Sequence, residues 1–379
     1  MLPERVARAR DLCAEWVKSG HTPAIVALVA RRGVVVLHEA FGALRPGPDA
    51  SALRRDSLFP MSSITKPMAA SVLMTLVEDG LIGLNRPLVD YLPEISGEGT
   101  GEILLHHVLT HTAGYDDFAF VNAHADELQE FIERGDVGAL RRETLRRLYS
   151  TPVQTAPGAV MNYSPLTYML LGEIAQRVTG RSFPELVQER LFDPLGMGDS
   201  VLAVPDALRG RVVKRPAGAP WTWQRAFLTG IDSRMCEDDV NSSGGVFSTA
   251  RDAAAFGQMF LNGGGYGSAR VLSHAGVEAM TRNQTPGVPA HMGETAGKQA
   301  SYGYGWFIQS HEKWRYWDGS LPSLGSFHHQ GAGGVLLWVD PAREIVGVYL
   351  SVDLAATPEL EPLWNADLFQ NVVTAAVAD

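Results

Sequence analysis

The sequence predicts an α+β fold, in which both ends of the chain build one antiparallel sheet flanked by helices and the middle forms an inserted, mainly helical domain. Strand-like runs occur near both ends, and helical periodicity dominates residues 65–200. The strand-like runs follow one another along the chain and do not alternate with helices, which disfavours a βαβ arrangement. We therefore expect a sheet domain from residues 1–65 and 225–379 and a helical domain from residues 66–224.

The first elements are a helix and two strands. Residues 3–19 carry apolar side chains at helical spacing and predict an amphipathic helix. Residues 24–30 and 34–38 are strand-like, and the short Arg-Arg-Gly segment between them predicts a hairpin.

The last elements mirror the first. Strands are predicted at residues 303–309, 313–317, 335–339 and 345–352, with a turn sequence at 340–344, and a helix at 358–377. Loops rich in proline and glycine at 215–220 and 285–300 are expected to border a cleft.

Composition limits the class of protein. The 379 residues are 45% hydrophobic and 20% charged, with a net charge of −10, values of a soluble globular protein without a nucleic-acid-binding face. The first residues lack the apolar stretch of a secretory signal, and the two cysteines, Cys13 and Cys236, predict neither a disulfide framework nor a cysteine metal site. We expect a cytoplasmic protein that needs no cofactor or metal and binds neither membrane nor nucleic acid.

A Ser-x-x-Lys stretch, Ser63 to Lys66, is the strongest chemical signal. Only five of the 32 basic residues are lysines, and lysine, unlike arginine, loses its proton when it is desolvated. Apolar residues from Met68 onward have helical spacing, and Pro67, which fits only the first turn, places the helix start near Ser63. Residues i and i+3 share a helix face, so the pattern pairs a nucleophile with a base. An ordinary N-cap serine is the alternative interpretation.

A second copy of the pattern, Ser310 to Lys313, has a different context. It connects two predicted strands, so its serine and lysine are expected in a hairpin turn and not on one helix face.

Two further residues are candidates for the same chemistry. Tyr163 precedes a helical run at 168–178 and is a candidate acid or base, although a half-buried structural tyrosine is the commoner reading. His329 stands before Gly331, Gly333 and Gly334, where small residues let a backbone approach a ligand; a turn histidine is the alternative.

Six segments occur in the order found in one known family: residues 59–67, 89–93, 107–114, 243–250, 302–306 and 331–335. Together with Tyr163 and His329, they make the chain resemble the serine β-lactamase and penicillin-binding-protein superfamily from about residue 10 to about residue 355. The resemblance is to the class C-like branch, which includes family VIII carboxylesterases, D-amino peptidases and some acyltransferases.

The resemblance implies a site between two domains and a role for each residue. Ser63 would be the acylated nucleophile, Lys66 an amine with a lowered pKa, and Tyr163 a proton shuttle, either as a phenolate base or through Lys66. His329 matches the lysine or histidine of the third motif of the family. The backbone N–H groups of Ser63 and Ala332 would form the oxyanion hole. The substrate-binding residues expected on these grounds are Gln330, Gly331 and Trp306.

Two departures bear on the activity. Pro165 stands where β-lactam-cleaving relatives usually have an asparagine two residues after the tyrosine, and it offers no donor. The third motif reads His329-Gln330-Gly331, and the larger Gln330 is expected to narrow the pocket or bind substrate. Both changes argue against an efficient β-lactamase and are compatible with ester cleavage or acyl transfer. We expect a small-molecule carboxylic ester as the substrate.

Several alternatives stay open at this stage. The same residues would serve a β-lactamase, a D-amino peptidase or an acyltransferase, and a non-catalytic penicillin-binding or assembly-forming homologue is a further alternative. The oligomeric state is not predicted.

Other motifs favour structural roles. His107 and His111 have metal-ligand spacing, but without a third ligand capping and packing roles are favoured, and His106 is expected to be exposed. Gly198-Asp199-Ser200 resembles the start of another esterase motif, but it follows a helix-end turn. Trp221, Trp223, Trp314 and Trp317 could equally line an acyl pocket or belong to the core and a lid.

Overall fold

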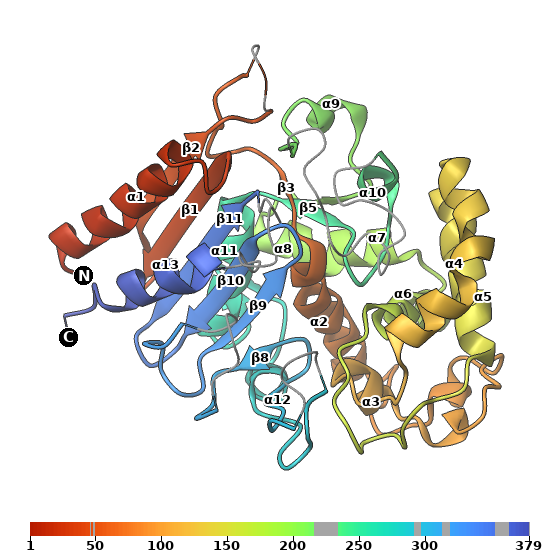
Figure 1. The fold of residues 1–379 in the computed structure, drawn as a ribbon. Coiled ribbons are helices and arrows are strands. Elements are labelled where there is room, and N and C mark those ends of the chain that lie inside the picture. The colour runs from red at the N-terminus through yellow and green to blue at the C-terminus, as the bar shows by residue number, and fades with distance from the viewer. Residues whose placement is uncertain are drawn as a thin grey trace.

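The computed structural model describes residues 1–45, 47, 50–215, 234–291, 297–312, 319–352 and 364–378. A six-stranded antiparallel sheet carries helices on both faces, and helices from the middle of the chain lie beside it (Figure 1). The predicted α+β class is confirmed. The strands are β1 (Ala24–Arg31), β2 (Val34–Gly42), β3 (Phe59–Pro60), β4 (Val201–Leu202), β5 (Val246–Ser248), β6 (Gly265–Tyr266), β7 (Ala269–Arg270), β8 (Phe307–Ile308), β9 (Phe327–Gly331), β10 (Val335–Asp340) and β11 (Ile345–Ser351).

The α-helices of the same described residues include two long ones at the chain ends and a series through the middle. They are α1 (Pro3–Lys18), α2 (Thr65–Glu78), α3 (Leu105–Leu109), α4 (Asp117–Glu133), α5 (Val137–Ser150), α6 (Pro165–Thr179), α7 (Phe183–Val187), α8 (Asp193–Leu195), α9 (Asp206–Arg209), α10 (Arg234–Asp238), α11 (Ala250–Leu261), α12 (His274–Thr281) and α13 (Trp364–Thr374).

The two ends of the chain meet inside the main sheet, as predicted. Its strand order is β2-β1-β11-β10-β9-β8, and Ala27 of β1 pairs with Tyr349 of β11. Strands far apart in the sequence are therefore neighbours, and the sheet can be completed only when both ends of the chain are present.

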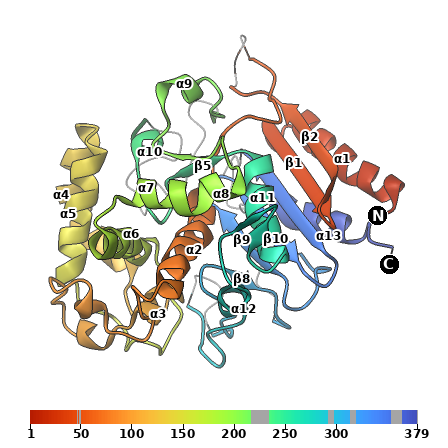
Figure 2. The ribbon, with the colours of Figure 1, turned by 180° about the vertical axis from the view of Figure 1, so that it is seen from behind.

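Side-chain alternation along the strands gives the main sheet two buried faces. Ile25 and Val29 of β1 join a core with α1 and α13, whereas Val26 and Leu28 join the larger core that includes α11. Figure 2, seen from behind, shows α11 against the sheet, with α1 and α13 on the opposite face.

Helix α2 lies where the sheet meets the helices of the middle segment. Every residue from Thr65 to Leu76 is buried, and α2 packs against α6 and α7. A helix that is buried around its whole circumference has neighbours on all sides. Because α2 begins at Thr65, two residues after Ser63, this packing fixes the backbone close to that residue. The domain boundaries at 65/66 and 224/225 remain a prediction.

Some predicted elements differ from the structure. The strand predicted at 303–309 is shortened to β8, because Gly305 adopts a φ of +85° and turns the chain toward α2. A Cβ atom at Gly305 would lie 2.8 Å from the Cα of Pro67, so a side chain is excluded there. His329, expected ahead of a strand, lies inside β9.

Parts of the remaining predictions fall on other residues. The strand predicted at 313–317, the four tryptophans considered for a pocket or lid, and residues 358–363 of the predicted last helix lie outside the described residues. Within the described part of the chain, no helix has the length and apolar character needed to cross a bilayer.

Candidate active site

Ser63 and Lys66 come together at the start of α2. The Nζ atom of Lys66 lies 2.9 Å from the Oγ atom of Ser63 and 2.8 Å from the carbonyl oxygen of Ser243. Lys66 is fully buried, whereas Ser63 is partly exposed. Ser63 can therefore be reached in part from solvent, whereas Lys66 beside it cannot.

Local hydrogen bonds fix the start of this helix. The N–H of Met61 donates to the carbonyl of Val246 at 2.8 Å, which anchors β3 on β5 just before the turn Ser62–Ile64. The N–H of Val246 in turn donates to the hydroxyl of Thr65 at 3.1 Å. Pro67 stands in the first turn of α2, as predicted.

Burial changes the protonation of Lys66. Removal from water destabilises the ammonium form and lowers the pKa of Lys66 to about 7, while the carboxyl of Asp117 acts in the opposite direction. Close to neutral pH a large fraction of the side chain is the free amine, which is the form that accepts a proton.

Tyr163 lies beside this pair. The Nζ atom of Lys66 is 4.9 Å from the centroid of its ring, and a hydrogen bond links Tyr163 with Ser63. Desolvation nevertheless holds the pKa of Tyr163 well above its usual range, so the phenol is neutral at neutral pH. The loop at 285–300, expected to border a cleft, contacts this region: the N–H of Met161 donates to the carbonyl of Pro289 at 2.9 Å.

His329 also reaches the cluster. Its ring centroid is 6.1 Å from that of Tyr163, and its Nε2 atom is 3.3 Å from the hydroxyl of Tyr302. The Nδ1 atom lies 2.6 Å from the carbonyl of Gln330, so Nδ1 carries the proton and Nε2 accepts. Complete burial and the neighbouring Lys66 keep the pKa of His329 well below its usual value, so the imidazole is uncharged.

The turn after β9 brings Ala332 to the same place. The hydroxyl of Ser62 donates to the carbonyl of Ala332 at 2.8 Å, and Ser62 adopts a φ of +46°. A Cβ atom on Gly331 would lie 2.3 Å from the carbonyl oxygen of Met61. Only glycine therefore permits this close approach of the two backbones, which sets Ala332 beside the serine turn.

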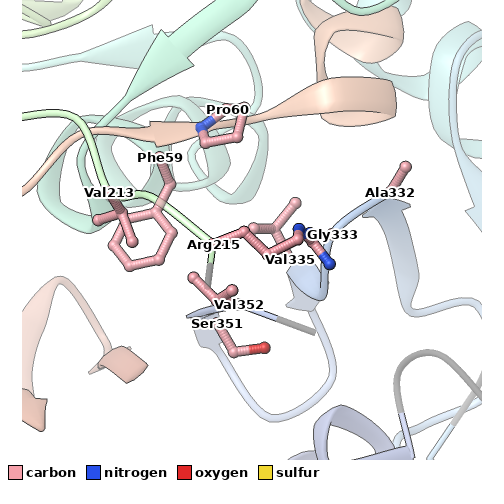
Figure 3. A pocket seen from close by; sticks show the side chains of 9 residues that line it. All are labelled: Phe59, Pro60, Val213, Arg215, Ala332, Gly333, Val335, Ser351 and Val352. Carbon is pink, nitrogen blue, oxygen red and sulfur yellow. The ribbon is translucent and has the colours of Figure 1, made fainter. Parts of the chain in front are cut away.

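A small pocket borders this turn (Figure 3). Its lining is mostly aliphatic and aromatic carbon from β3, the β9–β10 turn and the end of β11, and it includes one cationic residue. The lining residues are Phe59, Pro60, Val213, Arg215, Ala332, Gly333, Val335, Ser351 and Val352.

Two of the predicted substrate-binding residues are not placed for that role. Gln330 pairs with Leu336, which belongs to the core under α1 and α13, so its side chain points to the opposite face from His329. Trp306 is fully buried and packs against Phe256 and Phe327 in the main core, so it is not exposed to a ligand. Gly331 contributes through its backbone alone.

The remaining motifs have structural roles. The Nδ1 atom of His107 accepts the N–H of Leu104 at 3.1 Å, which caps α3 as expected. His106 is half-buried, 2.9 Å from the hydroxyl of Tyr304, so the expected exposure is wrong. Across the described ranges, no group of three histidine, cysteine, aspartate or glutamate side chains is arranged to hold a metal ion. Ser200 is buried against Asp252.

Sequence reasoning missed two residues next to the site. His111, weighed only as a metal ligand or packing residue, is buried with its ring 4.3 Å from that of Tyr163. Asp117 belongs to no motif of the sequence, yet its carboxylate accepts the hydroxyl of Ser164 and the N–H of Leu166. The sequence signal for His111 is its place in the segment 107–114, whereas Asp117 has none beyond its place at the start of a helix.

An α+β fold with a serine and a buried lysine at the start of a central helix defines a class of serine hydrolases, and comparison with known proteins agrees. The family model "Beta-lactamase" matches residues 9–370, so the chain belongs to the β-lactamase family and is a hydrolase of that superfamily.

Individual relatives span more than one activity. Penicillin-binding protein 4 of Amycolatopsis lactamdurans is 29% identical over 89% of this chain and 82% of its own length. Esterase EstB of Burkholderia gladioli is 34% identical over 46% of this chain and 45% of its own. The crystal structure of a family VIII carboxylesterase superposes with a TM-score of 0.73 at 21% identity, covering 97% of both chains.

Proposed function

We propose that the protein is a carboxylesterase that cleaves esters through an acyl intermediate on Ser63. The observation that carries the proposal is the 2.9 Å contact between the partly exposed hydroxyl of Ser63 and the fully buried amine of Lys66. A serine hydroxyl is a weak nucleophile until a neighbouring base accepts its proton. Lys66 can be that base near neutral pH, because its lowered pKa leaves a large fraction of the side chain as the free amine.

In the acylation step, the Oγ atom of Ser63 attacks the ester carbonyl and its proton passes to the Nζ atom of Lys66. The C–O bond to the alcohol then breaks, and the alkoxide takes up a proton through Tyr163, which is re-protonated by Lys66. In the second step a water molecule attacks the acyl group, its proton passes to the same pair, and Ser63 leaves with its hydroxyl restored. The net products are an alcohol and a carboxylic acid.

The roles of Lys66 and Tyr163 differ in this scheme. Because the pKa of Tyr163 is raised, its phenolate is scarce at neutral pH, and the neutral phenol serves as a relay. Lys66, by contrast, exists substantially as a free amine. These shifts favour Lys66 as the base and Tyr163 as the group that hands the proton to the leaving alcohol.

We propose that the backbone N–H groups of Ser63 and Ala332 bind the oxyanion of the tetrahedral intermediate. Support comes from the hydrogen bond of Ser62 to Ala332 and from the close approach of Gly331 to Met61, which hold the two backbones together. Losing one such donor typically costs about 3 kcal/mol of transition-state stabilisation.

The charge around Ser63 favours esters without a free carboxylate. The third motif contributes His329, whose imidazole is neutral, where a charged lysine would attract an anionic substrate. The amine of Lys66 is largely uncharged near neutral pH, and it is already engaged by Ser63 and Ser243.

The experiment that tests the proposal is intact-mass detection of acyl adducts combined with turnover of a substrate panel. The panel comprises nitrophenyl acetate and butyrate, nitrocefin, a D-alanyl anilide and an acyl thioester with an alcohol acceptor. Ser63→Ala is compared with Ser310→Ala, which removes the serine of the second Ser-x-x-Lys copy, a partly exposed residue whose hydroxyl donates to the carbonyl of Glu312.

We expect acetyl and butyryl adducts and fast ester turnover in the unmodified protein and in Ser310→Ala, and neither in Ser63→Ala. Faster turnover of nitrocefin, the anilide or the thioester would instead assign a β-lactamase, D-amino peptidase or acyltransferase. A stable β-lactam adduct without turnover of any substrate would assign a non-catalytic penicillin-binding homologue.

A further inference from the structure

The segment that carries Tyr163 is held on both sides by one other segment, residues 111–117. The N–H of Asn162 donates to the carbonyl of His111 at 2.8 Å, and the N–H of Ser164 donates to the Nδ1 atom of His111 at 3.0 Å. Both backbone neighbours of Tyr163 are therefore bonded to the same residue, which fixes where the phenol ring leaves the chain.

His111 is built into this position at a cost in backbone energy. It adopts a φ of +58°, which is uncommon for residues other than glycine although histidine is found there more often than most, and it is almost fully buried. Its ring centroid lies 4.3 Å from that of Tyr163 and 4.7 Å from that of Tyr168. Strain of this kind persists where the surrounding structure imposes it, and it is concentrated at functional sites.

Asp117 binds the residues that follow Tyr163. Its Oδ1 atom accepts the hydroxyl of Ser164 at 2.5 Å, and its Oδ2 atom accepts the N–H of Leu166 at 3.0 Å. Ser164 is the N-cap of α6 and accepts the N–H of Thr167 at 3.1 Å. The carboxylate thus fastens the first turn of α6, immediately after Tyr163.

Asp117 also contributes charge to the site. It is the anion that acts on Lys66, and desolvation raises the pKa of Asp117 itself to about 6. The other titratable groups that interact with Lys66 are the imidazoles of His111 and His329, both neutral, and the rings of Tyr163 and Tyr168.

Building on the proposed esterase function, we propose that His111 and Asp117 are positioning residues, which hold the Tyr163 hydroxyl between Ser63 and the leaving alcohol. Neither touches the reacting atoms. His111 acts through the backbone on both sides of Tyr163, whereas Asp117 acts through Ser164 and Leu166 and through its charge near Lys66. Displacing a catalytic group by about 1 Å can cost about 100-fold in rate, so such supports are functionally important.

The first test replaces the carboxylate with an amide of the same shape. In Asp117→Asn, one of the two hydrogen bonds is lost and the anion near Lys66 disappears. We expect kcat for nitrophenyl butyrate to fall about tenfold. The acidic limb of kcat/KM should move to lower pH, because removing the anion lowers the pKa of Lys66 further.

The matched control is Asp116→Asn. Asp116 is the adjacent aspartate and caps α4 by accepting the N–H groups of Phe118 and Ala119, away from Tyr163. This variant keeps the helix cap, because the amide oxygen of asparagine can accept the same N–H groups, and it removes a negative charge adjacent to Asp117. It should leave both kcat and the acidic limb unchanged. A variant that is merely destabilised would lower Tm without moving the limb.

The second test separates the two functions of His111. His111→Phe keeps an aromatic ring against Tyr163 but removes the acceptor for Ser164, and kcat should fall about tenfold with KM nearly unchanged. His111→Asn keeps an acceptor and tolerates the positive φ, and should retain more activity. In a Tyr163→Phe background, His111→Phe should have no further effect, because the residue acts through the missing hydroxyl.

Each result decides the inference. Wild-type kcat and an unmoved acidic limb in both Asp117→Asn and His111→Phe, measured per active site titrated with a fluorophosphonate, would overturn it while leaving the esterase proposal intact. Full additivity of His111→Phe with Tyr163→Phe would also overturn it. Absence of any Ser63-dependent turnover in the unmodified protein would reject the esterase function, and the positioning role with it.

Discussion

Ser63 and Ser200 are both hydroxyls held beside a titratable side chain, yet their surroundings differ. Ser63 is partly exposed and contacts the amine of Lys66, whereas Ser200 is 2% exposed and contacts Asp252 at 3.0 Å and Ser248 at 2.8 Å. The carboxylate of Asp252 also accepts the N–H of Asp199 at 2.9 Å. A nucleophile requires an accessible hydroxyl, which Ser200 lacks, and a strong base, and the carboxylate beside Ser200 is an intrinsically weaker base than an amine.

The largest expected effect separates the two serines directly. Ser63→Ala should lower kcat/KM for nitrophenyl butyrate by at least about 10,000-fold, because it removes the atom that is acylated. Ser200→Ala should leave turnover unchanged. Steady-state kinetics of the two purified variants measures this difference. Equal losses of kcat/KM in both variants would contradict the assignment of Ser63 as the nucleophile.

Removing the proton relay should have the next largest effect. Tyr163→Phe keeps the ring against Lys66 and His111 but deletes the hydroxyl, so kcat should fall by about 100-fold, the usual contribution of general acid catalysis. Esters with better leaving groups need less help from an acid. The loss should therefore be smaller for a nitrophenyl ester than for an ethyl ester of the same acid, and a loss independent of the leaving group would contradict the relay.

The pH dependence tests whether Lys66, beside Ser63, acts as a base, a role that Asp252 beside Ser200 does not have. The pKa of Lys66 is lowered to about 7, and the active form is the free amine, so activity is present above pH 7 and lost as the pH falls. We expect kcat/KM to decrease about tenfold per pH unit below pH 7. A profile that is flat from pH 5 to 8 would show that the amine is not the base.

The smallest effect concerns stability alone. Ser200→Ala removes a buried hydrogen bond to a carboxylate and should lower the free energy of unfolding by about 2 kcal/mol. Urea denaturation followed by circular dichroism measures this change. Ser63→Ala should change the unfolding free energy much less, since its hydroxyl is partly exposed.

Local patterns in the sequence were sufficient to predict the helix that carries the site. Ser63 and Lys66 are three residues apart and Pro67 limits the helix start, so their proximity follows from helix geometry alone. The pairing of the two chain ends also followed from their strand-like runs. The positions of Tyr163, His329 and Ala332 rested on resemblance, since no local pattern joins them to Ser63.

The failures share one physical cause, which is that tertiary contacts are not local in sequence. Gln330 is expected in the pocket, but its side chain lies on the opposite face of the sheet from that of His329. Which face each residue takes depends on how β9 is paired with β10, and the sequence does not give that register. Trp306 is also expected at the pocket, but its ring packs in the core against Phe256 and Phe327. Asp117 reaches Ser164 across 47 residues of sequence, and no spacing rule connects the two.

The enclosure of Lys66 has a practical consequence for attaching the protein to a surface. Reagents that modify primary amines need solvent access, which Lys18 offers and Lys66 does not. Coupling the folded chain to an aldehyde or succinimidyl support should therefore spare the amine on which turnover depends. Loss of that protection would report that the central helix has opened.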